Sequence, residues 1–407
     1  MLDTGDLSGD PDEAGRLKSR NLLQGMAMIG YDAINAGEKD LADGVKAFRD
    51  LADKSNLTFI NANFVYRDTG DVFLPPFEIK QYALGPGRTI KVGYLGLNTL
   101  NSAFAKETPE GRVVVMHEPA EAAKKYAPIL DSKVDLLVLI GNLSPRDLTT
   151  VLSAAPQIDL ALVSYGPRLS TDGSFEKIQN VPVFYAGDQG KRLGEVRVTF
   201  KEKGARPDFF PSHVLLTQRY PSDPKLETLI EATTTRVNEI NRQKATAQAA
   251  VATAPSSAGG PGAGAAGLTR RDPAPLGVDT AIRQAEGRPF LSVRVCASCH
   301  MKEHQTWYES AHSRAFQTLV TANQDYNPEC VKCHVTGFAE EEGFTNIRQT
   351  PDLANVQCEA CHGNATEHLK DLQKPFGKVP PRLCFTCHTK ENSPEFVFFK
   401  YWEKIKH

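Results

Sequence analysis

Four short stretches of the chain share one pattern: CASCH (296–300), CVKCH (330–334), CEACH (358–362) and CFTCH (384–388). Each stretch holds two cysteines that are separated by two residues and followed at once by a histidine. The chain contains 8 cysteines, and all of them belong to these motifs. The spacing allows two thiols to add across the two vinyl groups of one haem, and it places an imidazole beneath the iron. The motifs therefore predict four covalently attached haem c groups.

Two other uses of cysteine pairs explain the pattern less well. A zinc site built from C-x-x-C pairs needs four ligands but no histidine at a fixed next position, and a disulfide framework has no such rule either. The chain has only 10 histidines, so a histidine after every pair would rarely arise by chance. The predicted haem-binding residues are Cys296, Cys299, His300, Cys330, Cys333, His334, Cys358, Cys361, His362, Cys384, Cys387 and His388.

The sixth ligand of each iron separates an electron carrier from a catalyst. Two axial histidines leave an iron that only exchanges electrons, whereas an open position can bind a small substrate. His304 lies one helical turn after His300 and faces the same way, so we expect it not to be a ligand. His312 and His368 lie too near their own motifs to reach around the same ring, and they are better placed to bind neighbouring haems. The last residue, His407, could return to the fourth motif.

The predicted iron ligands thus form two sets. The motif histidines bind on the proximal side, and three further histidines bind on the distal side. The full set is His300, His334, His362, His388, His312, His368 and His407.

The motif region, over roughly residues 290–407, resembles a known family. CASCH followed by WYESAHSRAF (307–316), CVKCHVTGF (330–338) and CEACHG (358–363) are similar to the first three motifs of the tetrahaem cytochromes c that serve hydroxylamine oxidation in nitrifying bacteria. The chain between the third and fourth motifs is shorter here than in that family.

This resemblance implies a specific set of ligands. The first haem would take His368 as its distal ligand, the third would take His312, and the fourth would take His407. The second haem, on His334, would be left five-coordinate.

Upstream of the motifs, the composition indicates three regions. Residues 1–205 alternate short apolar runs with amphipathic stretches, which predicts an α/β layered domain. Residues 206–284 form a connecting segment that includes an Ala/Gly/Pro-rich linker at 252–275. Residues 285–407 form the haem domain, which we expect to be mainly α-helical and rich in loops. The haems would supply most of its core.

The α/β domain and the connecting segment contain clear candidate elements. We expect a short strand pair within 197–217 and a polar helix over 222–250. The other expected elements are strands at 58–66, 89–98, 134–142, 158–166 and 181–188 and helices at 44–54 and 118–133.

The first 200 residues resemble the metallophosphatase domain of periplasmic 5′-nucleotidases, in the calcineurin-like phosphoesterase superfamily. DTGDL (3–7) is similar to a metal-ligand strand of that family, with Asp6 at the bridging position. GYDAINAG (30–37) leads into the position of its G-N-H-E/D motif, where this chain has Glu38 and Lys39. The further matching runs are IGNL (140–143), VSYGP (163–167), VPVFYAG (181–187) and LGEVRVTF (193–200).

The resemblance also implies that the phosphatase chemistry is absent. A two-metal phosphoesterase holds its ions with histidines and carboxylates, and every matching histidine is replaced here. We therefore predict a catalytically degenerate, N-terminally truncated domain with no catalytic residues. Asp6, Glu38 and Asp40 could hold one hard ion such as Ca²⁺, but a solvated acidic cluster is the favoured interpretation.

Charge and hydropathy exclude some partners. The net charge is -2 and charged residues make up 24%, which indicates neither a nucleic-acid nor a membrane-surface partner. No apolar run approaches the roughly 20 residues of a membrane-spanning helix. Because haem is attached outside the cytoplasm, we expect a periplasmic or extracellular protein whose signal peptide is not in this chain. Its partners would be redox proteins or other cytochromes. An oligomer with haem contacts between protomers is an alternative that the sequence does not decide.

Three hypotheses for the function follow. The first is an exported multihaem electron carrier with a recognition or scaffolding domain. The second is a redox enzyme that acts on a small nitrogen compound at the open haem on His334. The third is a nucleotide-binding or nucleotide-hydrolysing protein with a cytochrome appendage.

Overall fold

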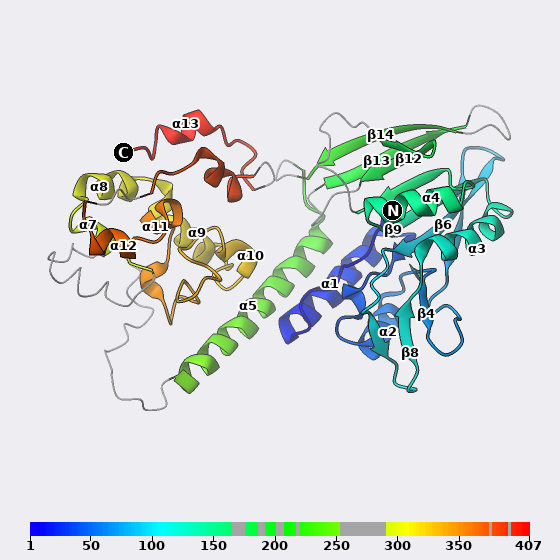
Figure 1. The fold of residues 1–407 in the computed structure, drawn as a ribbon, viewed down its shortest axis with the longest axis horizontal. Coiled ribbons are helices and arrows are strands. Elements are labelled where there is room, and N and C mark those ends of the chain that lie inside the picture. Colours follow the sequence, from blue (N-terminus) through cyan, green and yellow to red (C-terminus); the bar gives the residue numbers. More distant parts are fainter. Residues whose placement is uncertain are drawn as a thin grey trace. The chain divides into compact units, whose positions relative to one another are not determined.

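The structure is a computed structural model of the 407-residue chain. It describes residues 1–164, 176–185, 192–200, 207–216, 220–252, 290–373, 377–389 and 392–407. The chain divides into two compact units, Met1–Ile230 and Glu231–His407, and each is considered by itself (Figure 1).

A six-stranded sheet forms the centre of the first unit. Its four inner strands run parallel, and an antiparallel strand flanks them on each side. In spatial order the strands are β11 (Glu176–Ile178), β12 (Val181–Tyr185), β10 (Leu160–Val163), β9 (Leu136–Asn142), β6 (Thr89–Asn98) and β5 (Phe77–Ala83).

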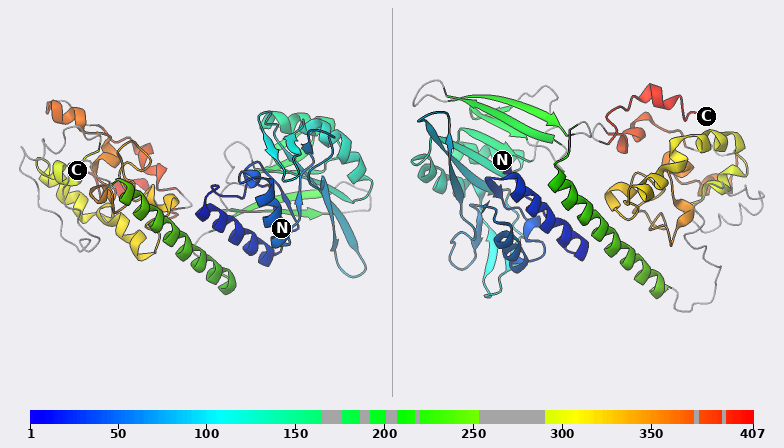
Figure 2. Two further views of the ribbon diagram at one scale, coloured as in Figure 1. Left: turned by 90° about the horizontal axis from the view of Figure 1, so that it is seen from below. Right: turned by 180° about the vertical axis from the view of Figure 1, so that it is seen from behind.

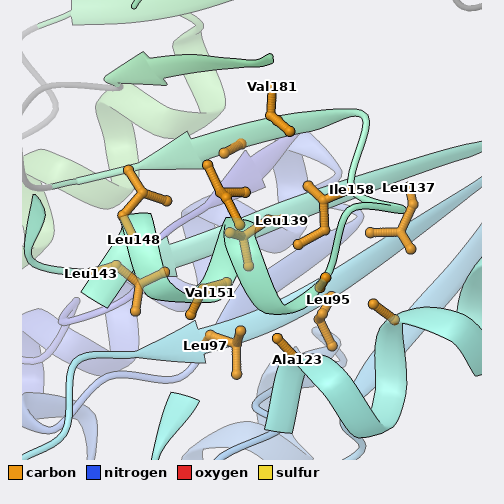
Figure 3. Close-up of a cluster of buried hydrophobic side chains, with 14 of the residues drawn as sticks. Leu95, Leu97, Ala123, Leu137, Leu139, Leu143, Leu148, Val151, Ile158 and Val181 are labelled. Carbon is orange, nitrogen blue, oxygen red and sulfur yellow. The ribbon is translucent and has the colours of Figure 1, made fainter. Parts of the chain in front are cut away.

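Alternating side chains along these strands build two apolar layers. Odd-numbered residues such as Leu95 and Leu139 pack with α3 (Pro119–Asp131) and α4 (Pro145–Ala154) on one face, as Figure 3 shows. Even-numbered residues of the same strands pack on the opposite face against β1, β2, β3 and the β13–β14 pair. The predicted α/β layered fold is therefore confirmed.

Smaller sheets complete the first unit. The parallel sheet β1-β2-β3 (Leu2–Asp3, Ala33–Asn35, Phe59–Ile60) packs with α1 (Glu13–Ile29) and α2 (Val45–Ser55) in a second core. The other two sheets comprise β4 (Phe64–Tyr66), β8 (Val113–Met116) and β7 (Ala105–Glu107), and the hairpin of β13 (Arg192–Thr199) and β14 (Asp208–Leu215). This hairpin is the strand pair expected within 197–217, and it starts earlier than expected.

Helix α5 (Pro224–Ala252) belongs to both units, and Figure 2 shows it uninterrupted in both views. Asp223 caps its first turn, since its Oδ1 accepts hydrogen bonds from the backbone of Lys225 and Leu226. The predicted helix over 222–250 is confirmed. The rest of the expected linker, residues 253–275, lies outside the described residues.

The second unit consists of short helices joined by loops. The helices are α7 (Val293–Ala297), α8 (Met301–Glu309), α9 (Ala315–Thr321), α10 (Pro328–Val331), α11 (Cys358–His362), α12 (Thr366–Lys370) and α13 (Phe398–Trp402). The described residues of this unit form no strand. The predicted mainly α, loop-rich domain is therefore confirmed. In the described parts of the chain, no helix is both long and apolar enough to cross a membrane.

Candidate haem-binding site

Three pairs of histidine rings face one another in the second unit. The ring centroids are 6.1 Å apart for His300 and His368, 6.1 Å for His312 and His388, and 5.7 Å for His362 and His407. Each pair joins one motif histidine to one histidine from outside the motifs. The motif histidine His334 is in none of these pairs.

These separations match the space that a metal ion needs between two imidazoles. Imidazole nitrogens bind transition metals at about 2 Å, so two rings on opposite sides of one ion have centroids roughly 6 Å apart. The three pairs therefore fit iron with two axial histidines, which is one of the ligations with which haem c exchanges electrons.

Hydrogen bonds hold several of these rings in the orientation that a metal requires. Nδ1 of His362 donates to the carbonyl of Gly377 at 2.8 Å, and Nδ1 of His407 donates to the carbonyl of Ile405 at 2.9 Å. Nδ1 of His388 lies 3.1 Å from the hydroxyl of Ser393. A proton held on Nδ1 leaves the lone pair on Nε2, which is the atom available to the metal.

The pairs differ from two of the ligand assignments that the family resemblance implied. His368 faces His300 as expected, but His312 faces His388 and His407 faces His362. The two distal histidines have thus exchanged their expected partners. Val356 N donates to the carbonyl of His312 at 3.3 Å and holds the turn Ala311–Arg314 next to the residues that precede the third motif.

The second motif is arranged differently. Nδ1 of His334 donates to the carbonyl of Ala315 at 2.6 Å and lies 3.3 Å from the hydroxyl of Thr318. Among the ring contacts of the described residues, no histidine faces it. The ring of His304 packs beside Trp307, with centroids 5.5 Å apart, rather than opposite a motif histidine.

The cysteines bring the motifs together two by two. The thiols of Cys296 and Cys358 are hydrogen bonded, which together with burial raises the pKa of Cys296. Cys333 is likewise hydrogen bonded to Cys387, and burial and this contact raise its pKa to about 11. The first motif is therefore next to the third, and the second is next to the fourth.

Two buried polar side chains connect the first and third motifs. The carboxylate of Glu359 accepts hydrogen bonds from the backbone of Leu291 and Ala365, at 2.5 and 2.8 Å. Gln357 accepts from Val293 N at 2.6 Å. Because Leu291 and Val293 lead into the helix that carries Cys296, this contact fixes the relative position of the two motifs. The sequence pattern did not indicate either residue.

An aromatic cluster surrounds the fourth motif and was also missed. The ring of Phe396 stacks on His388 with a centroid distance of 4.4 Å and an interplanar angle of 9°. Tyr401 lies 6.2 Å from the same imidazole. The run FVFF (396–399) is the sequence signal that could have indicated this cluster.

In the first unit, the carboxylates of Asp6 and Glu38 are hydrogen bonded to protein donors. Asp6 Oδ2 accepts a hydrogen bond from Asn142 Nδ2 at 2.6 Å, and Asp6 Oδ1 accepts from Lys39 N at 2.9 Å. Asn142 Oδ1 accepts from the hydroxyl of Ser164 at 2.9 Å. Glu38 accepts a bond from Asn101 Nδ2 at 2.8 Å. These side chains are therefore paired within the protein.

Asp40 corrects the interpretation of a solvated acidic cluster. Its side chain is buried, and its two carboxylate oxygens accept hydrogen bonds from the backbone of Asp6, Leu7, Ser8 and Gly37 at 2.8–3.1 Å. Asp40 therefore ties the loop after β1 to the loop after β2. In the described residues, no cluster of three or more His, Cys, Asp or Glu side chains could hold a metal ion.

Comparison with known proteins assigns different relatives to the two parts of the chain. Residues 295–363 match the model of the family described as cytochrome c554 and c-prime. The chain is 32% identical over 146 residues to cytochrome c-554 of Nitrosomonas europaea, which covers 27% of this chain and 62% of that protein. It is 25% identical over 149 residues to protein UshA of Salmonella pullorum, which covers 36% of this chain and 26% of UshA.

Among solved structures, a 5′-nucleotidase precursor from Thermus thermophilus is similar at 19% identity and a TM-score of 0.48, over 58% of this chain and 49% of that chain. The chain thus spans less than two thirds of the length of each of the curated relatives. The prediction that it fuses two unlike parts is confirmed, and the similarity of one part to c-type cytochromes implies covalently bound haem c.

Proposed function

We propose that this protein is an exported electron carrier that holds four haem c groups in residues 285–407. The observation that carries the proposal is the set of three facing histidine pairs, with ring centroids 5.7 to 6.1 Å apart, each built on a different C-x-x-C-H motif. Haem c supplies one-electron chemistry without proton transfer or bond cleavage. The attachment and ligand residues are those predicted from the motifs.

The contacts between motifs support exchange of electrons within the unit. Cys296 lies against Cys358, and Cys333 lies against Cys387. Burial, and after it the nearby Cys384, raises the pKa of Cys361 to about 11. Cys361 of the third motif therefore lies near Cys384 of the fourth motif. The four attachment points thus form one series of neighbours, from the first motif through the third and fourth to the second. The physiological partners are then redox proteins or other cytochromes.

The first unit would serve in recognition or scaffolding and not in hydrolysis. This part of the proposal is supported by the hydrogen bonds that Asp6 accepts from Asn142 and Lys39. A carboxylate that is already bonded to two protein donors is a poor ligand for a dinuclear metal centre. The placement outside the cytoplasm follows from the chemistry of haem attachment.

The test is to count the haems and the spin states of the irons. Protein matured in a host that exports it and attaches haem should carry four haems by intact mass. Low-temperature EPR of the ferric protein should show three low-spin irons and one high-spin iron. Fewer than four haems, or failure of the reduced protein to pass electrons to any cytochrome or quinone-linked partner, would overturn the proposal.

The unmatched His334 favours a second candidate function. An open iron on this histidine could bind a small nitrogen compound, because a vacant axial position is what substrate binding requires. Turnover of nitric oxide, nitrite or hydroxylamine at a rate well above that of free haem would support this candidate. Four low-spin irons in the EPR spectrum would exclude it.

A further inference from the structure

A part of α5 that lies before the Ala/Gly/Pro-rich linker contacts the second unit's loop Asn323–Tyr326. Asn238 Nδ2 donates to the carbonyl of Asn323. One turn later, Asn241 Nδ2 donates to the carbonyl of Tyr326 at 3.0 Å. Arg242 Nη2 donates to Asn323 Oδ1 at 3.0 Å. Three side chains on one face of the helix therefore bind one short loop.

The contact includes an ion pair with a buried acid. Arg242 lies 3.1 Å from Asp325, whose side chain is only 9% exposed, while that of Arg242 is 45% exposed. The guanidinium also lies 5.6 Å from the centroid of the Tyr326 ring. Val237 and Ile240, on the same stretch of helix, are each 3% exposed. Removing the cationic partner of a buried carboxylate is strongly destabilising. Loss of this contact would therefore destabilise the second unit.

The loop leads directly into the second haem motif. Asn327 N donates to the carbonyl of Gln324 at 3.0 Å, and Asn327 Oδ1 caps α10 by accepting from Glu329 N at 3.2 Å. Helix α10 carries Cys330, whose thiol lies 3.9 Å from Gln324 Oε1. The position of this motif therefore depends on the loop that α5 holds.

We propose that residues 237–242 of α5 are a docked part of the haem unit and position the motif that ends in His334. Asn238 and Arg242 are positioning residues, since they act through the loop. The helix lies outside the residues that the family model matches, 295–363.

Cleavage of the linker tests the docking directly. A specific protease site is inserted between residues 260 and 270 of the full chain, and the cut protein is passed over a size-exclusion column at micromolar concentration. The two fragments should co-elute. In the double variant Asn238→Ala/Arg242→Ala, we expect the dissociation constant of the fragments to rise by about tenfold or more. Separation of the unsubstituted fragments would overturn the proposal.

A matched control lies on the same helix. Arg236 forms an exposed ion pair with Glu239, 2.6 Å long, and both side chains are about half exposed. Arg236→Ala should leave the co-elution unchanged, because exposed pairs contribute little. If Arg236→Ala and Arg242→Ala weakened the association equally, the effect would come from the charge of the helix and the docking proposal would fail.

The positioning role has its own readout and rests on the proposed haem on His334. In the uncut chain, Arg242→Ala should shift the EPR signal and the reduction potential of the high-spin iron while the three low-spin signals stay in place, and Arg242→Lys should restore part of the change. Unchanged signals in Arg242→Ala would refute positioning. Absence of haem in the unsubstituted protein would instead refute the proposed function, and the fragment experiment would still decide the docking.

Discussion

The polar side chains at the candidate sites of the two units differ in how they are paired. In the first unit, polar side chains are bonded to one another, and the carboxylate of Asp6 accepts hydrogen bonds from Asn142 and Lys39. In the second unit, the rings of His300 and His368 face one another with their centroids 6.1 Å apart. The separation of these two rings matches the space that a metal ion needs between two imidazoles.

This contrast is a way to separate a retained site from a retained fold. A buried polar group must have a hydrogen-bond partner. Where a site binds no cofactor, its polar side chains find these partners within the protein. A retained cofactor site instead leaves groups whose pairing partner is the cofactor. Substitution of a single polar group shows whether that group stabilises the fold or binds a cofactor.

The largest effect should come from Asp40, which we assign to the structure of the first unit. Asp40→Ala leaves four backbone N–H groups without an acceptor in a buried place. Each such group costs about 1–3 kcal/mol, so we expect a loss of at least about 4 kcal/mol in the free energy of unfolding of this unit. Hydrogen exchange of peptides that cover β1 and β2 would measure it, with the haem absorbance as a separate probe of the second unit.

Asp43→Ala is the matched control for this prediction. Asp43 pairs with Arg16 on the surface, where the Arg16 guanidinium lowers the pKa of Asp43. We expect this substitution to change stability by less than about 1 kcal/mol. An equal effect of both variants would mean that Asp40 is not the connection between the two loops.

A smaller effect, which depends on pH, is expected from Asp3. Burial, and less so the nearby Asp40, raises the pKa of Asp3 from 3.8 to about 6. A folded-state pKa above the unfolded value stabilises the protein at low pH, and this stabilisation is lost as the pH rises from about 4 to about 6. Two pKa units correspond to at most about 3 kcal/mol.

Asp3→Asn should remove this dependence, since the amide keeps an oxygen for the hydrogen bond from Gly5 N. The first unit of the variant should then be the more stable one at pH 8, with little difference at pH 4. Parallel unfolding curves of the two proteins between pH 4 and 8, followed by hydrogen exchange, would contradict the raised pKa.

In the second unit, the facing histidine pairs predict which iron each substitution changes. His312→Ala should convert the low-spin iron on His388 to high spin, and His407→Ala should do the same to the iron on His362. Loss of an axial histidine should also shift the potential by on the order of 0.1 V, because axial ligands are a main determinant of the potential. EPR and a redox titration measure both effects.

Removal of one haem at a time identifies the iron. The new high-spin signal of His312→Ala should disappear when Cys384→Ser/Cys387→Ser is added, and it should persist when Cys358→Ser/Cys361→Ser is added instead. The opposite result would restore the assignment that the family resemblance implied.

The sequence predicted best where one local signal dominates. The run TIKVGYLGLN indicated a strand over 89–98, and β6 has these bounds, because alternate residues of this run face two apolar layers. The strand expected at 58–66 is broken instead. Asn61 Oδ1 accepts hydrogen bonds from the backbone of Asn63 and Phe64, which turns the chain between β3 and β4. Side chain to backbone bonds of this kind compete with a sheet.

The haem-binding site also contains residues that a local sequence signal predicts and residues that it does not predict. Proximal histidines such as His300 follow from the motif, because covalent attachment and ligation are local in sequence. The distal partners do not follow, since they depend on how separate loops meet. Asn355 and Val356 hold the chain near His312, and nothing in their sequence indicates it. The anchors Gln357 and Glu359 were missed for the same reason.

The smallest effect should come from Asn142, whose side chain is hydrogen bonded to Asp6. Asn142→Ala removes the donor of the 2.6 Å hydrogen bond to Asp6 and should destabilise the first unit by about 1–2 kcal/mol. Zinc or manganese should not raise the melting temperature of either protein, because a metal that binds the folded state would have to stabilise it. A clear metal-dependent rise in melting temperature, or cleavage of nucleoside monophosphates by the metal-loaded protein, would show that the first unit also has a functional site. Without either, the hydrogen bond between Asp6 and Asn142 is a structural contact of the first unit.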